Sequence, residues 1–141
     1  MRVAALVVAA CFACLPVVAS AQTPRGAIAP GNTVLIAGYN CAADQLARAD
    51  ALVNEIAAPI LNKHVASGKL LTWGYMGVYI GNQNNRSIYV WAADPVALVQ
   101  ARVTYLAEIN GNPKFQEFVK ICGSATITLH NLITTSPAPA R

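Results

Sequence analysis

The chain has 141 residues, 55% of them hydrophobic, and its ten lysines and arginines outnumber six aspartates and glutamates to give a formal net charge of +4. This length suits a single domain. The basic residues are scattered along the chain with no run of neighbours, so the charge predicts solubility and no nucleic-acid partner.

Residues 1–21 have the pattern of a signal peptide. Arg2 is followed by an apolar run over residues 3–18 and then by Ala19-Ser20-Ala21, the order of a charged start, a hydrophobic region and a small-residue cleavage site. The run is too short for a membrane span. We therefore predict cleavage near Ala21 and a periplasmic or secreted protein. A lipid-modified Cys11 is the alternative, but the residues after it stay apolar, whereas a lipoprotein tether is usually polar.

Both ends of the mature chain lack a packing pattern. Residues 22–32 are rich in proline and glycine and predict a flexible N-terminal segment. Residues 134–141 form a tail of proline and alanine that predicts disorder. One folded domain is expected between them, over residues 33–133.

The first half of this domain predicts a strand, a helix and a hairpin. Residues 33–39 are apolar and rich in β-branched side chains, which favours a buried strand. From residue 45 to 66 apolar side chains recur with the helical period, and Pro59 is expected to kink or divide this helix. Residues 70–80 and 87–92 predict two strands joined by a polar turn.

The second half predicts two helices and a last strand. Asp94-Pro95 and Asn112-Pro113 each combine a capping residue with a proline at the first helical position. The helices are expected to end near residues 110 and 121, and residues 125–133 alternate as a strand does. The order βαββαβ predicts an α+β, ferredoxin-like fold: a four-stranded antiparallel sheet of order 4-1-3-2 with its helices on one face.

Two cysteines, Cys41 and Cys122, remain after the signal peptide is removed. An even pair in an exported protein predicts a disulfide, and two buried free thiols are the alternative. The predicted topology brings the end of the first strand beside the start of the fourth. It therefore places both cysteines at the same corner of the sheet, in agreement with a disulfide.

The layout over residues 33–133 resembles the dimeric α/β barrel superfamily of ferredoxin-like subunits. More narrowly, Tyr39-Asn40-Cys41, Trp73-Gly74, Asn85-Arg86 and Ile121-Cys122 resemble a group of uncharacterised secreted bacterial proteins. The superfamily resemblance implies a homodimer that pairs through the sheet face. The superfamily includes monooxygenases, isomerases and proteins without known catalysis, so it implies no single chemistry.

Large aromatic side chains gather on the predicted hairpin. Trp73, Tyr75 and Tyr79 share one side of its first strand, and Tyr89 and Trp91 share one side of its second. We expect small aliphatic residues to face the helices, which would turn the aromatic side toward a partner subunit or a small apolar or aromatic ligand. The aliphatic residues in question are Val34, Ile36, Val78, Ile88 and Val90.

Histidines are the only candidates for acid–base chemistry. His64 falls late in the first helix, where a histidine favours the helix dipole. His130 lies on the last strand beside threonines and is the catalytic candidate, as a general base or, alternatively, a haem ligand. The mature chain has no paired-ligand spacing for a metal, so neither a metal site nor a cofactor is predicted.

Three classes of function remain. The leading prediction is an exported homodimer that is non-catalytic or binds a small apolar ligand. The second is a small monooxygenase-like or isomerase-like enzyme, and the third is a monomeric interaction module. The ligand-pocket candidates for the first two classes are Tyr39, Asn40, Trp73, Tyr75, Tyr89, Trp91 and His130.

Overall fold

The computed structural model describes residues 28–78 and 83–134. The predicted signal peptide, most of the N-terminal segment, Tyr79 and nearly all of the C-terminal tail lie outside the described residues. Within those that are described, no helix has the length and apolar character needed to cross a membrane.

The elements follow the predicted order βαββαβ. They are β1 (Thr33–Tyr39), η1 (Ala43–Gln45), α1 (Leu46–Leu52), η2 (Val53–Ala57), α2 (Ala58–Ala66), β2 (Thr72–Gly77), β3 (Arg86–Ala92), α3 (Pro95–Ile109), α4 (Pro113–Cys122) and β4 (Thr126–Asn131).

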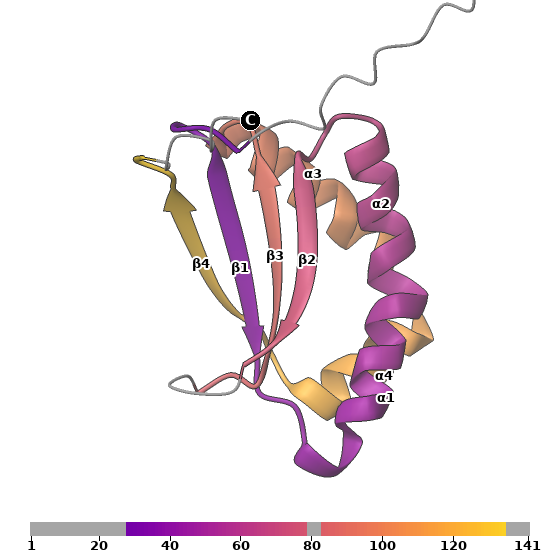
Figure 1. Ribbon diagram of the computed structural model, residues 1–141. Coiled ribbons are helices and arrows are strands. Elements are labelled where there is room, and N and C mark those ends of the chain that lie inside the picture. The colour runs from indigo at the N-terminus through magenta and orange to yellow at the C-terminus, as the bar shows by residue number, and fades with distance from the viewer. Residues whose placement is uncertain (1–27, 79–82, 135–141) are drawn as a thin grey trace, which may run out of the picture.

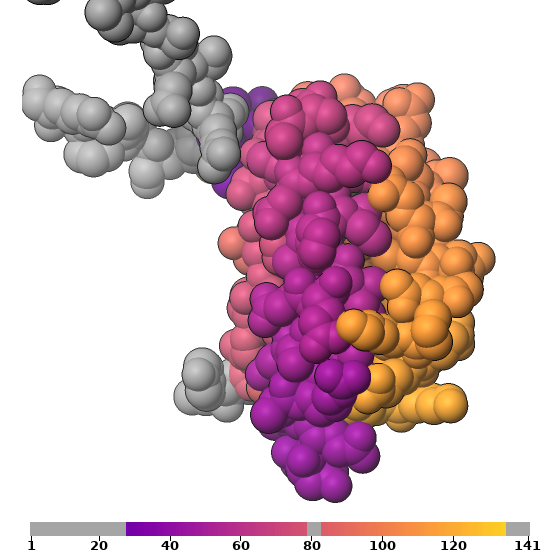
Figure 2. All heavy atoms as spheres, turned by 90° about the vertical axis from the view of Figure 1, so that its right-hand side faces the viewer, coloured from indigo at the N-terminus to yellow at the C-terminus, as the bar shows by residue number. Residues whose placement is uncertain are grey.

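The strands form one four-stranded sheet in the order β2-β3-β1-β4, and each neighbouring pair is antiparallel. Read from the other edge this is 4-1-3-2, which confirms the predicted ferredoxin-like topology. The four helices lie on one side of the sheet (Figure 1). Figure 2 shows their outer surface, where α1 and α2 form one continuous column beside α3 and α4.

Side-chain caps fix where the last two helices begin. The Asp94 carboxylate accepts a hydrogen bond from the Ala97 amide at 2.9 Å, and the Asn112 side chain accepts one from the Lys114 amide at 2.9 Å. Both helices place proline directly after the cap, where its missing N–H costs nothing. These starts confirm the sequence prediction.

The long first helix passes Pro59 without a break. Residues 53–57 form a π-turn, in which the Ala58 amide donates to the Val53 carbonyl five residues earlier. A π-turn adds one residue to the helix, so it shifts the side chains that follow by one position. Leu61 and His64 are accordingly buried, at 3% and 1% exposure.

The two faces of the sheet are set by strand register. Leu35, Ala37, Ile88 and Val90 belong to the core beneath the helices. The opposite side of the sheet, called the open face below, carries the alternate positions. From the sequence, Val34 and Ile36 were expected to face the helices. This was wrong, because both lie on the open face and their neighbours Leu35 and Ala37 face the helices.

The hairpin corrects a second expectation. Trp73 pairs with Val90 and Tyr75 with Ile88, and directly paired residues share a face. Trp73 and Tyr75 thus pack against the helices, whereas Tyr89 and Trp91 lie on the open face. Val78 follows the open-face parity of β2, so its predicted position facing the helices was wrong as well.

Gly74 serves this packing rather than a strand bulge. The pairing of β2 with β3 is continuous from Thr72 to Gly77, without a bulge. A Cβ at position 74 would collide with the Tyr89 ring and hydroxyl. The glycine therefore makes room for Tyr89 to lie across the edge strand.

Cys41 and Cys122 form a disulfide. Cys41 follows β1 and Cys122 ends α4, and both are almost fully buried. The bond joins the corner where β1 ends to the helix that leads into β4, so the predicted pairing is confirmed in the structure.

Candidate functional site

A cavity lies between the helix-facing side of the sheet and helices α3 and α4. It has a volume of about 310 Å³, within the range of pockets that hold small molecules. Its walls are largely apolar, with Leu35 and Val90 from the sheet and Leu106 and Phe115 from the helices. This inner cavity is the candidate binding site.

Two phenols and one guanidinium are the main polar groups on its wall. Tyr39 ends β1, whereas Arg102 and Tyr105 come from α3. Within the described part of the chain, neither phenol oxygen has a hydrogen-bond partner and Arg102 has no ion pair. All three groups are therefore available to a ligand.

The electrostatics of the phenols keep them protonated. Burial raises the pKa of Tyr39, although the positive charge of Arg102 opposes the rise. Burial also raises the pKa of Tyr105, and the nearby Tyr39 adds to that effect. Both hydroxyls are hydrogen-bond donors at neutral pH and poor general bases.

Tyr39 is the one predicted pocket residue that lines the inner cavity. Arg102 and Tyr105 were missed as site residues, although a signal for Tyr105 existed. Leu98, Ala101, Tyr105 and Ile109 follow helical spacing, and this side of α3 faces the sheet.

Trp73 and Tyr75 are held by the first helix and do not line the inner cavity. The Trp73 indole N–H donates to Asn62 Oδ1 at 2.8 Å, and the Tyr75 hydroxyl donates to Asp50 Oδ1 at 2.7 Å. Each ring therefore fixes β2 to the helix layer. The expectation that these two aromatics point away from the helices was wrong.

The remaining candidates are separated from the inner cavity. His130 pairs with Val34, which pairs on its other side with Trp91, so these three form a row across the open face. Because Tyr39 lies on the helix-facing side, the sheet stands between it and His130. Asn40 is exposed beyond the end of β1. The structure does not bring these candidates together into one pocket.

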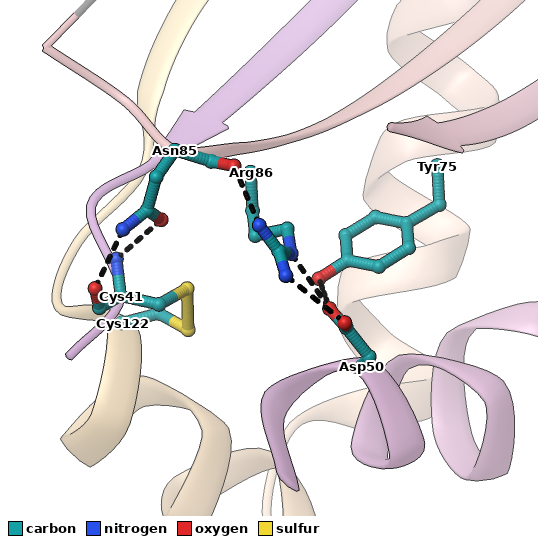
Figure 3. Close-up of a disulfide and its surroundings, with 6 residues drawn as sticks. All are labelled: Cys41, Asp50, Tyr75, Asn85, Arg86 and Cys122. Carbon is teal, nitrogen blue, oxygen red and sulfur yellow. Dashed lines mark hydrogen bonds and ion pairs between the residues drawn. A yellow bond between two sulfur atoms is a disulfide. The ribbon is translucent and has the colours of Figure 1, made fainter. Parts of the chain in front are cut away.

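Several of the residues that carry the narrow resemblance, among them Cys41, Asn85 and Cys122, meet at the disulfide corner (Figure 3). The Asn85 side-chain amide donates to the Cys41 carbonyl at 2.7 Å, and its oxygen accepts from the Cys41 amide at 2.9 Å. The Asn85 backbone amide also donates to the Tyr39 carbonyl. Asn85 thus satisfies the backbone N–H and C=O of Cys41, which lies just beyond the end of β1 and has no strand partner there. The role of Asn85 is structural.

Next to this corner Asp50 joins α1 to the hairpin. Arg86 donates to both carboxylate oxygens, at 2.7 and 3.0 Å, and Tyr75 shares one of them. The hydrogen bond from Arg86 is the main cause that lowers the pKa of Asp50. The arrangement is a bidentate ion pair with a third donor, and it holds helix and sheet at a fixed distance.

His64 lies in the last turn of α2, as predicted, and is also buried against α3. Its Nε2 is 3.2 Å from Glu108 Oε1, and this hydrogen bond is the first cause of the lowered pKa of Glu108. Among the described residues, His64 Nδ1 has no hydrogen-bond partner. The described residues also contain no group of three acidic, histidine or cysteine side chains placed to hold a metal ion.

Comparison with solved structures finds this architecture in proteins of low sequence identity. A dimeric ferredoxin-like protein from an uncultured marine organism matches with a TM-score of 0.60 at 18% identity, over 76% of this chain and 99% of that one. An uncharacterized NIPSNAP-like domain protein from Burkholderia xenovorans matches with 0.54 at 17% identity, over 76% and 90%.

A third similar structure is an enzyme. SnoaB, a cofactor-independent oxygenase from Streptomyces nogalater, has a TM-score of 0.52 at 11% identity, over 78% of this chain and 99% of that one. No protein-family model and no curated protein matches the sequence. At these identities the similarity establishes the architecture alone, and the chain is a ferredoxin-like α+β protein.

Proposed function

We propose that this protein is an exported homodimer that binds a small apolar molecule in the inner cavity of each subunit. The observation that carries the proposal is the cavity itself, about 310 Å³ of mostly apolar space. Burying an apolar ligand there gains about 25 cal/mol per Å² of apolar surface. The phenols of Tyr39 and Tyr105 supply the few polar contacts that orient a ligand.

A binding role fits the chemistry of the cavity better than catalysis. Catalysis by general base needs a group with a pKa near the working pH, and both cavity phenols have raised pKa values. The enzyme alternative, including the cofactor-independent oxygenase chemistry of one similar structure, lacks such a group among the described cavity residues. His130 is on the other face of the sheet.

Filling the cavity tests the binding site. Leu106 lines the inner cavity and is 41% exposed, so Leu106→Trp fits at the surface while its ring takes up cavity space. We expect it to weaken binding of the neutral dye N-phenyl-1-naphthylamine by about tenfold, because the dye loses the apolar contacts of the cavity. The measurement is a fluorescence titration.

Val96→Trp is the matched control for this titration. Val96 lies on the same helix, is 65% exposed, and does not line the cavity. It should leave dye binding unchanged. Equal binding by Leu106→Trp and the wild type would place the dye elsewhere and contradict the proposed site.

Dimerisation is proposed through the open face. Trp91 and Tyr89 lie there beside Val34 and Ile36, and Met76 is 40% exposed at its edge. Two copies of such a face would bury the aromatic rings between them, as interfaces enriched in tryptophan and tyrosine do. The dimeric ferredoxin-like relative in fold is consistent with this arrangement.

Trp91→Glu should break the proposed dimer. A charge at the centre of an apolar interface is expected to raise the dimer dissociation constant at least about tenfold, measured by native mass spectrometry. Val96→Glu on the helix side is the control and should stay dimeric, and the circular dichroism of both variants should match the wild type. A wild-type monomer would contradict this part of the proposal.

Export is supported by the residue pattern before position 22 and by the disulfide, since disulfides persist in oxidising compartments. Native mass spectrometry of protein from its own host reports the N-terminus in the same spectrum as the subunit count. A chain that begins near Gln22 supports export, and an uncleaved chain counts against it.

A further inference from the structure

Helix α3 is apolar on two sides. One side packs on the sheet through Leu98 and Ala101, but Val99 and Val103 on the other side are 55% and 64% exposed. A surface helix of a soluble protein normally places polar residues there. Across from them, Leu129 on β4 is 51% exposed although it lies on the helix-facing side of the sheet.

These exposed side chains line an outer groove between α3 and β4. The groove has a volume of about 350 Å³, and Val99, Val103 and Leu129 belong to it but not to the inner cavity. Leu35, Arg102, Leu106 and Ile127 line both. The inner cavity and the outer groove therefore adjoin, and together they suit an elongated molecule rather than a compact one.

Among the described residues, Arg102 is the only charged one on the wall of either space. The other side chains of the outer groove are all apolar, and Arg102 is itself exposed, so its guanidinium is accessible to a charged group of a ligand that lies in the groove. Within the described residues Arg102 has no carboxylate partner. All six acidic residues are described, and five of them bind elsewhere: Asp50 to Arg86, Glu55 and Glu117 to Arg48, Glu108 to His64 and Lys63, and Asp94 to its own helix.

The two phenols of the inner cavity also suit an anion. The positive charge of Arg102 acts on the Tyr39 phenol, and Tyr39 in turn acts on Tyr105. One guanidinium with neighbouring hydroxyl donors is a good set of partners for a carboxylate.

Resting on the proposed function, we infer that the ligand is a long-chain carboxylic acid. Its carboxylate pairs with Arg102, which lines both spaces, and its apolar chain lies against their apolar walls. The chain would cover Val99, Val103 and Leu129, which accounts for their exposure.

A matched set of probes tests the charge. The wild-type protein is titrated by calorimetry with decanoate, decan-1-ol and decyltrimethylammonium, which share one chain length and differ in charge. We expect decanoate to bind at least about tenfold more tightly than decan-1-ol, with the cation weakest. In Arg102→Gln the preference for decanoate over decan-1-ol should disappear while decan-1-ol binds as before.

A second pair of variants tests the outer groove. Val103→Gln should weaken hexadecanoate about fivefold and decanoate less, because the longer chain covers more of the groove. Val96→Gln, equally exposed on α3 but outside both spaces, should change neither.

The outcomes separate this inference from the proposed function. If decanoate and decan-1-ol bind equally, and Arg102→Gln changes nothing, the apolar site stands and the carboxylic acid is wrong. Tighter binding of the cation also overturns the inference. If no probe binds and N-phenyl-1-naphthylamine does not bind either, the inference and the proposed function fail together.

Discussion

Loss of the Cys41–Cys122 disulfide is expected to lower the free energy of unfolding by about 4 kcal/mol. The bond closes a loop across a sequence separation of 81 residues, and the loss of chain entropy in the unfolded state is worth about 4.5 kcal/mol for a loop of that length. Both cysteines are buried at the junction of β1 and α4, so the double variant Cys41→Ala/Cys122→Ala removes the cross-link with little change in volume. Urea denaturation of the two proteins measures the difference.

A reductant supplies the control for this prediction. It should destabilise the wild type to about the level of the double variant and leave the double variant unaffected. The Asn85 hydrogen bonds to Cys41 use backbone atoms, so they are retained in the variant and the folded state should persist. Two results would contradict the role given to the disulfide: a wild-type free energy of unfolding that does not change with the reductant, or a mass that shows two free thiols.

Asp50→Asn is expected to cost about 2 kcal/mol of unfolding free energy at neutral pH. Breaking a fully buried ion pair costs about 3–5 kcal/mol. The cost here is lower because the Asp50 side chain is 39% exposed, whereas Arg86 is 17% exposed and would lose its anion. Glu55→Gln is the matched control: Glu55 pairs only with exposed cations, so this variant should destabilise the protein much less than Asp50→Asn.

The pH dependence of the same pair has a definite sign. The pKa of Asp50 is lowered below its ordinary value of 3.8, first by the hydrogen bond from Arg86. The unfolded chain therefore takes up a proton more readily than the folded one, and the stabilisation is complete above the unfolded pKa and lost as the pH falls through the folded value. Between about pH 7 and pH 3 the stability gap between wild type and Asp50→Asn should narrow. A gap that widens in acid would contradict this account.

Much of the fold could be predicted from the sequence because its signals are local and agree with one another. Asp94-Pro95 and Asn112-Pro113 mark the helix starts that the structure shows, and β1 has the predicted bounds. The element order then limits the sheet to few topologies. The predicted topology places Cys41 and Cys122 at one corner of the sheet. The disulfide between them could therefore be predicted from the sequence.

The faces of the hairpin could not be predicted in the same way. Alternation tells which side chains share a face within one strand, but register decides which face that is. Trp73 opposite Val90 places the indole over the helices, and a shift by one residue would have turned it over. The large size of an aromatic side chain therefore did not indicate which face of the sheet it occupies.

The candidate site was missed for reasons of helix phase and residual volume. The π-turn at residues 53–57 buries Leu61, where an uninterrupted helical period favours Ile60. On α3 the apolar residues surround the helix, so the side that faces the sheet was ambiguous and Tyr105 was overlooked. The inner cavity depends on how closely α3 and α4 approach the sheet, and no local pattern encodes that distance.

The contact of Tyr89 with Gly74 has a consequence for how this sequence can change over time. The ring of Tyr89 occupies the space that a side chain at position 74 would need, so the two positions are not independent. A lineage that replaces the glycine must first accept a smaller residue at position 89, and it then loses an aromatic ring from the open face. Substitutions at these two positions should therefore be inherited in pairs, and subunits that retain the glycine should also retain the ring.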